Sequence, residues 1–192
     1  MGFLETEDEN TVTGYLRRAL HHEAESVRAF ERIARELAFH GAPVELIEGA
    51  RCAANDERTH AARCAALLGT DAQIAGDSLP VRSLFELALD NQSEGCVIES
   101  LGALVNTHQA RYASTPTLRA HFAAIAADEL NHAALAHAIA AWIGPLLSPV
   151  ELAALHTAEE LARRELSFDA HAYASELGMP TGERVQQLLA FI

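Results

Sequence analysis

The sequence predicts an all-α protein built on a four-helix bundle, in which one connection is much longer than the others. Three observations support this fold class. The chain is rich in Ala, Leu, Glu and Arg, and aromatic residues make up only 6% of it, which is a helix-forming composition. Apolar residues recur at helical spacing over long stretches. Gly and Pro punctuate these stretches at intervals.

The first two helices are expected to form a hairpin. Residues 11–39 form the first helix and residues 44–68 the second. Gly41 and Pro43 separate them, because Gly suits the end of a helix and Pro suits the first turn of the next one. Gly69 closes the second helix. The apolar column of the first helix comprises Leu16, Leu20, Val27, Phe30, Ile33 and Leu37.

A second hairpin follows a linker that covers residues 70–80 and contains Asp, Gly, Ser and Pro. Its helices cover residues 81–113 and 117–143, with a short turn at 114–116. Two hairpins with short turns and one longer connection are typical of a four-helix bundle with a single crossover, here from the second helix to the third.

The domain organisation follows from these elements. Residues 1–145 form the bundle, and residues 146–192 form a helical extension of two or three short helices packed on it. Ser148 and Thr181 are typical residues for the starts of two of these helices.

Composition excludes several partners. The formal net charge is −13 and the pI is about 5.1, whereas nucleic acids and anionic membranes bind basic surfaces. No apolar run is long enough to span a membrane, and the acidic segment 1–10 lacks a signal-peptide core. Cys52, Cys64 and Cys96 are odd in number and form no C-x-x-C pair. We therefore expect a cytoplasmic protein with reduced thiols.

One seven-residue pattern occurs twice. Residues 56–62 read D-E-R-T-H-A-A and residues 128–134 read D-E-L-N-H-A-A. Positions i and i+3 share a helix face, so Glu57 points with His60, and Glu129 with His132. Both pairs continue apolar columns. Facing each other, the two helices would bring two carboxylates and two imidazoles together.

The first helix of each hairpin offers a further carboxylate. Glu23 lies in the apolar column of the first helix, where an unpaired charge is costly. The third helix offers Glu94 and Glu99. Counting residues from the turns does not decide between them. Glu99 shares its column with small residues that leave room for a ligand, so we favour it and keep Glu94 as an additional candidate.

Such a cluster would be unstable without neutralising charge. Two divalent cations would provide it, and mixed oxygen and nitrogen ligands suit iron, with manganese as the alternative. Cys64 and Cys96 lie near the same level of the bundle. Packing is their expected role, with thiol ligation as the open alternative.

These residues resemble the metal-binding pattern of the ferritin-like superfamily, closest in style to rubrerythrin-like and bacterial ferritin-like domain proteins. The resemblance covers residues 11–144. It implies that Glu57 and Glu129 bridge two irons, that His60 and His132 each ligate one, and that Glu23 and Glu99 are terminal ligands. The residues that carry it are Glu23, Glu57, His60, the segment 94–99, Glu129 and His132.

The sequence departs from rubrerythrins in several respects. They tend to carry Tyr seven residues after the carboxylate of the first helix, where this chain has Phe30, and the position seven after Glu99 is Asn106. A phenol that would tune the metals is therefore missing. There is also no rubredoxin module, so an electron donor must be separate.

The expected function is that of a non-haem di-metal carboxylate protein, an oxidoreductase acting with O2 or peroxide. One alternative is a protein that oxidises and handles iron without an organic substrate. Another is a helical interaction module with a vestigial metal site. The sequence does not choose a substrate, and it leaves a homodimer open.

Overall fold

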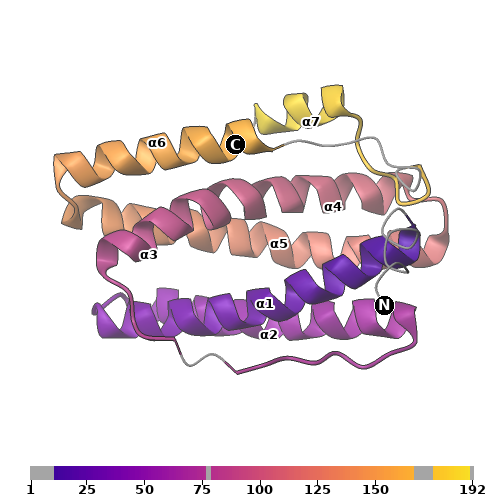
Figure 1. The fold of residues 1–192 in the computed structure, drawn as a ribbon, viewed down its shortest axis with the longest axis horizontal. Coiled ribbons are helices and arrows are strands. Elements are labelled where there is room, and N and C mark those ends of the chain that lie inside the picture. The colour runs from indigo at the N-terminus through magenta and orange to yellow at the C-terminus, as the bar shows by residue number, and fades with distance from the viewer. Residues whose placement is uncertain (1–10, 77–78, 167–174, 191–192) are drawn as a thin grey trace, which may run out of the picture.

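The described part of the chain, residues 11–76, 79–166 and 175–190 of a computed structural model, is all-helical, as predicted. Figure 1 shows two long hairpins lying lengthwise, with further helices along one side. The elements are α1 (Val12–Phe39), α2 (Val44–Leu68), α3 (Leu84–Asp90), the π-helix η1 (Asn91–Glu99), α4 (Ser100–Tyr112), α5 (Pro116–Ile143), the 3-10 turn η2 (Gly144–Leu146), α6 (Pro149–Glu165) and α7 (Gly182–Leu189).

The first hairpin has the boundaries that the sequence predicts. Thr11 starts α1, and its hydroxyl accepts a hydrogen bond from the Gly14 amide at 3.0 Å. Gly41 follows α1 at φ 74°, and Gly69 ends α2 at φ 66°. These backbone angles are in the left-handed region that favours glycine, which explains why both helices end there.

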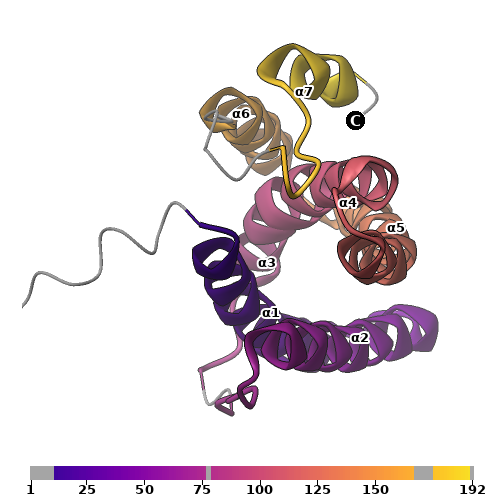
Figure 2. The same ribbon diagram turned by 90° about the vertical axis from the view of Figure 1, so that its right-hand side faces the viewer.

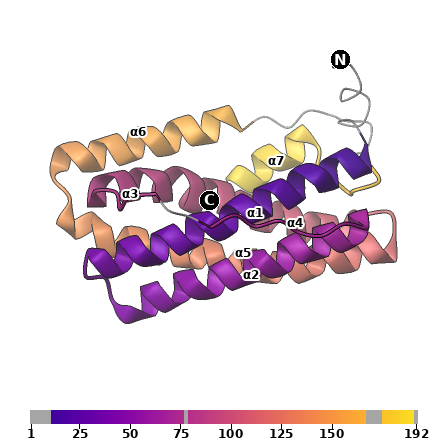
Figure 3. The same ribbon diagram turned by 60° about the horizontal axis from the view of Figure 1, so that its bottom comes forward.

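The long connection from α2 to α3 runs back along the first hairpin (Figures 1 and 3). A buried ion pair holds its far end. The Glu36 carboxylate in α1 is fully buried and lies 2.8 Å from the Arg82 guanidinium, which also lies 2.8 Å from the Asp90 carboxylate in α3. Arg32 donates to the carbonyl of Pro80 at 3.1 Å. The connection is thus fixed to both α1 and α3.

The third long helix differs from the prediction of one uninterrupted helix over residues 81–113. It begins at Leu84, where Ser83 and Glu86 form a capping box, and it passes through the π-helix η1 before α4. Gly95 in η1 lies so close to α5 that an added Cβ would be 2.7 Å from the Ala136 Cβ. The Asn91 side chain donates to the Ala136 carbonyl at 3.0 Å. These two contacts hold the widened turn against α5.

The two hairpins meet mainly through α2 and α5, and η1 also packs on α5. Seen end-on in Figure 2, α1 and α2 form one layer, and α4 and α5 form the other. Buried Leu37, Leu87, Ile139 and Ile143 form a core at one end. Between α1 and the η1–α4 segment the packing is incomplete, and two cavities lie there, floored by α5.

The C-terminal region packs on the second hairpin, on the side away from α2 (Figures 1 and 2). The Gln92 amide in η1 donates to Glu159 in α6 at 3.0 Å. Val185 and Leu188 of α7 are buried with Leu101 and Val105 of α4. In the part of the chain described, no helix has both the length and the apolarity needed to cross a membrane.

Candidate metal centre

The two copies of the repeat face each other across the interface between α2 and α5. All four of the repeated carboxylates and imidazoles are buried: Glu57 is 1% exposed, His60 0%, Glu129 7% and His132 2%. Their burial follows from the apolar columns that they continue, which are the faces by which the two helices pack. The predicted meeting of the two pairs is therefore what the structure contains.

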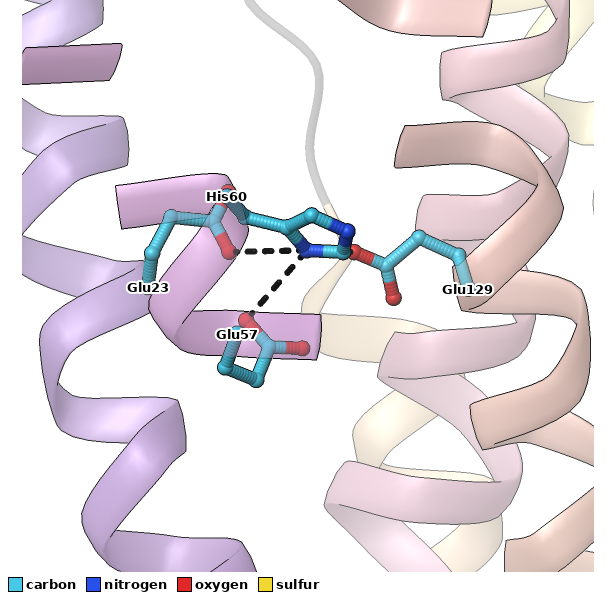
Figure 4. A group of neighbouring side chains, drawn as sticks. All are labelled: Glu23, Glu57, His60 and Glu129. Carbon is cyan, nitrogen blue, oxygen red and sulfur yellow. Dashed lines mark ion pairs between the residues drawn. The ribbon is translucent and has the colours of Figure 1, made fainter. Parts of the chain in front are cut away.

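The first group of potential metal ligands comprises Glu23, Glu57, His60 and Glu129. Figure 4 shows three carboxylates directed at one imidazole. The His60 Nδ1 atom lies 3.6 Å from a Glu23 oxygen, 3.6 Å from a Glu57 oxygen and 3.8 Å from a Glu129 oxygen. The group joins three helices, with Glu23 from α1, Glu57 and His60 from α2, and Glu129 from α5.

The second group comprises Glu57, Glu99, Glu129 and His132. The His132 Nδ1 atom lies 3.1 Å from a Glu57 oxygen and 3.5 Å from a Glu129 oxygen. Within each group the potential ligand atoms lie within 4.8 Å of one another. Glu57 and Glu129 belong to both groups, so the groups are adjacent and share two carboxylates. Each group could hold one metal ion.

Two aspartates that the sequence analysis did not single out position the imidazoles. The His60 Nε2 atom lies 3.1 Å from an Asp128 oxygen, and the His132 Nε2 atom lies 3.3 Å from an Asp56 oxygen. Each aspartate belongs to the other copy of the repeat. By engaging Nε2 they leave Nδ1 facing the carboxylates, as partners of metal-binding histidines do. The sequence held a signal for these two aspartates, because both copies of the seven-residue pattern begin with Asp.

Four atoms of the two groups are buried without a hydrogen-bond partner: Glu57 Oε2, His60 Nδ1, Glu129 Oε2 and His132 Nδ1. Buried polar atoms are almost always hydrogen-bonded. Four unpartnered atoms that converge on one place therefore indicate a missing partner. A cation satisfies carboxylate oxygens and imidazole nitrogens alike, so these residues fit metal ions.

Protons occupy the cluster when no cation does. Burial raises the pKa of Glu23 to about 8 and that of Glu99 well above its usual value, with the neighbouring carboxylates adding to the effect. Burial disfavours charged histidines, but the facing carboxylates outweigh it and raise the pKa of His60 to about 11 and that of His132 to about 10. Metal ions must displace these protons to bind.

The structure separates the two carboxylates that the sequence left as alternatives. Glu99 belongs to the second group, whereas Glu94 belongs to neither group and is exposed. In a π-helix the hydrogen bonds join residues i and i+5, so Glu94 and Glu99 lie about one turn apart. Both line the cavity between α1 and η1.

Phe30 and Cys64 are two uncharged residues near the centre. Phe30 lies against His132, with the ring centroids 5.0 Å apart. Cys64 is outside both groups, and burial raises the pKa of its thiol to about 12. Its sulfur lies 4.0 Å from the His121 Nε2 atom. A neutral, packed thiol is consistent with the expected packing role.

Compared with models of known protein families, with curated proteins and with solved structures, the chain matches none of them. The features that indicate its class of protein are the all-helical fold and the two groups of Glu and His residues.

Proposed function

We propose that this chain is a non-haem di-metal carboxylate protein built on a ferritin-like four-helix bundle. One observation carries the proposal. The two groups of potential ligands overlap in Glu57 and Glu129, and each group adds one histidine and one glutamate of its own. Di-iron carboxylate bundles have the same set of ligands, four carboxylates and two histidines.

Two iron ions are the proposed occupants, with manganese as the alternative, because carboxylate and imidazole ligands suit both metals. Glu57 and Glu129 would lie between the ions. His60 and Glu23 would complete one site, and His132 and Glu99 the other. Asp56 and Asp128 would keep the imidazole Nδ1 atoms directed at the metals.

The proposed activity is that of an oxidoreductase that uses O2 or peroxide, with electrons from a separate donor. Bound iron would supply the redox chemistry. The residues of the chain would bind and orient the metals and limit the access of water to them. Phe30 shields the His132 ring on the α1 side, and the cavity beside Glu99 and His132 offers space for a small substrate. This cavity favours an enzyme over a helical interaction module.

The test is metal content and reactivity. After anaerobic loading with Fe(II), we expect about two iron ions per chain and oxidation of that iron on addition of O2 or peroxide. The double variant Glu57→Gln/Glu129→Gln should lose both properties. A matched control, Glu48→Gln/Glu160→Gln, changes two exposed glutamates and should keep them. Equal iron binding by both double variants, or none by the unaltered protein, would overturn the proposal.

A further inference from the structure

A cavity of about 370 Å³ lies between α1, η1 and α5 and reaches the candidate metal centre. Glu99 and His132 form part of its wall. The Nδ1 atom of His132 is buried and has no hydrogen-bond partner. The cavity therefore borders a side chain with an unsatisfied nitrogen atom. The volume is at the small end of the range for ligand pockets, which limits an occupant to a small molecule.

The walls of this cavity are largely apolar. Phe30 and Ile33 project from α1, and Leu135 and Ile139 project from α5. Small residues, among them Ala29 and Ala136, leave the space between them open. An apolar molecule would bury its surface here at the expense of water, which is favourable in proportion to the area covered. The body of the occupant is therefore expected to be hydrocarbon.

Several other charged side chains at the rim are in ion pairs. Arg28 donates to both oxygens of Glu25, at 2.9 Å and 3.0 Å. Asp90 pairs with Arg82 at 2.8 Å, and Arg32 with Glu36 at 3.1 Å. These pairs neutralise most of the charge at the rim, and the buried Arg28 Nε atom is left without a hydrogen-bond partner.

Glu94 is different. Among the residues that the structure describes, its carboxylate has no hydrogen bond or ion pair, although it lines the same cavity. Burial and the charge of Asp90 raise the pKa of the Glu94 carboxyl, and His22 at the same rim acts in the opposite direction. The formal net charge of −13 further favours a cation over an anion. Among the described residues Glu94 belongs to neither group of potential metal ligands, so an organic cation fits this carboxylate better than a bare metal ion.

We propose that the cavity binds a small organic cation, a primary amine with a compact apolar body. Its ammonium group binds the Glu94 carboxylate, and its hydrocarbon part packs against Phe30, Ile33, Leu135 and Ile139, beside Glu99 and His132. As a statement about the substrate class of the metal centre, this inference rests on the proposed function. As a statement about binding, it stands on the cavity and on Glu94 alone.

The test uses benzylamine as the probe, with benzyl alcohol and benzoate as neutral and anionic controls of similar shape. Binding is measured by titration calorimetry on the full chain, both metal-free and metal-loaded. We expect benzylamine to bind about tenfold more tightly than benzyl alcohol, because a hydrogen bond to a charged group is the stronger kind. Benzoate should bind least. The variant Glu94→Gln should lose the preference for the amine, and Glu48→Gln on exposed α2 surface should keep it.

A second pair of variants tests the location. Ala29 is an exposed residue at the wall of the cavity, and Ala62 is an exposed residue of α2 away from it. Ala29→Trp should fill the space and abolish amine binding, whereas Ala62→Trp should leave it unchanged. Amine binding that is no tighter than alcohol binding, or that survives both Glu94→Gln and Ala29→Trp, would overturn the inference.

Metal content measured on the same samples separates the two proposals. If two metal ions bind but the amine preference is absent, the cavity inference fails alone. If the amine binds in a manner that depends on Glu94 while the chain holds no metal, the proposed function fails alone.

Discussion

The orientation of two histidine rings directs their Nδ1 atoms at the shared carboxylates of the candidate metal centre. His60 and His132 each offer Nδ1 to the shared carboxylates, because an aspartate from the opposite helix engages Nε2 at 3.1 Å and 3.3 Å. A ring that is free to rotate would present its ligand atom only part of the time. The two aspartates would thus act through the histidines rather than directly on the proposed metals.

Replacing these aspartates should weaken metal binding without unfolding the protein. For Asp56→Asn/Asp128→Asn we expect metal affinity to fall by about 10–100-fold, the usual effect of losing such partners. Both side chains are only half-buried, so the melting temperature of the metal-free protein should change little. The measurement is competition with a coloured chelator, and Asp71→Asn in the exposed connection is the control. Unchanged affinity in the double variant would show that the rings need no such support.

At the scale of elements, the π-helix decides which carboxylate of the third helix reaches the centre. Its widened turn depends on the close approach of Gly95 to α5. Periodicity in the sequence does not detect one extra residue in a turn, so the sequence predicted a continuous helix there. For the same reason it left Glu94 and Glu99 as alternatives.

Gly95→Ala should be destabilising, because the added Cβ would lie 2.7 Å from the Ala136 Cβ. Overpacking of this kind costs about 1–3 kcal/mol. The matched control is Gly102→Ala in α4, where an added Cβ has no heavy atom within 4 Å and higher helix propensity should add up to about 1 kcal/mol. Urea denaturation of the metal-free protein measures both. Equal effects of the two substitutions would contradict the close packing of η1 on α5.

The crossover depends on the fully buried Glu36 carboxylate. Removing one member of a buried ion pair leaves the other uncompensated, so Glu36→Gln should lower the free energy of unfolding by about 3 kcal/mol. Burial opposes the charged form of Glu36, but Arg82 and Arg32 outweigh it and lower the pKa of this carboxyl. This stabilisation is present above pH 4.5 and is lost as the pH falls through the lowered pKa. The variant should therefore lose less stability than the unaltered protein in acid. If the variant and the unaltered protein lost equal stability as the pH falls, this role of Glu36 would be contradicted.

At the scale of the whole molecule, local patterns predicted much of the architecture and the centre. The helical hairpin of residues 11–68 follows from apolar periodicity and from Gly41 and Gly69, and the repeat identified the residues that face each other across α2 and α5. The partnership of Asp56 and Asp128 with the histidines was missed, because it joins side chains of different helices. Such contacts depend on how α2 and α5 pack, which no local pattern encodes.

The cavity beside the centre also belongs to this scale. It exists because α1 packs on α2 but incompletely on η1 and α4. Sequence periodicity assigns each helix an inward face, and it does not say which pair of faces will stay apart. The proposed role of the unpaired Glu94 carboxylate, which is to bind an ammonium group, depends on this cavity.

The most direct test of the central claim is anomalous X-ray diffraction from crystals of the iron-loaded protein. The account predicts two iron peaks inside the cluster, one beside His60 and Glu23 and the other beside His132 and Glu99, with Glu57 and Glu129 between them. A single peak, or iron bound only outside the cluster, would contradict it.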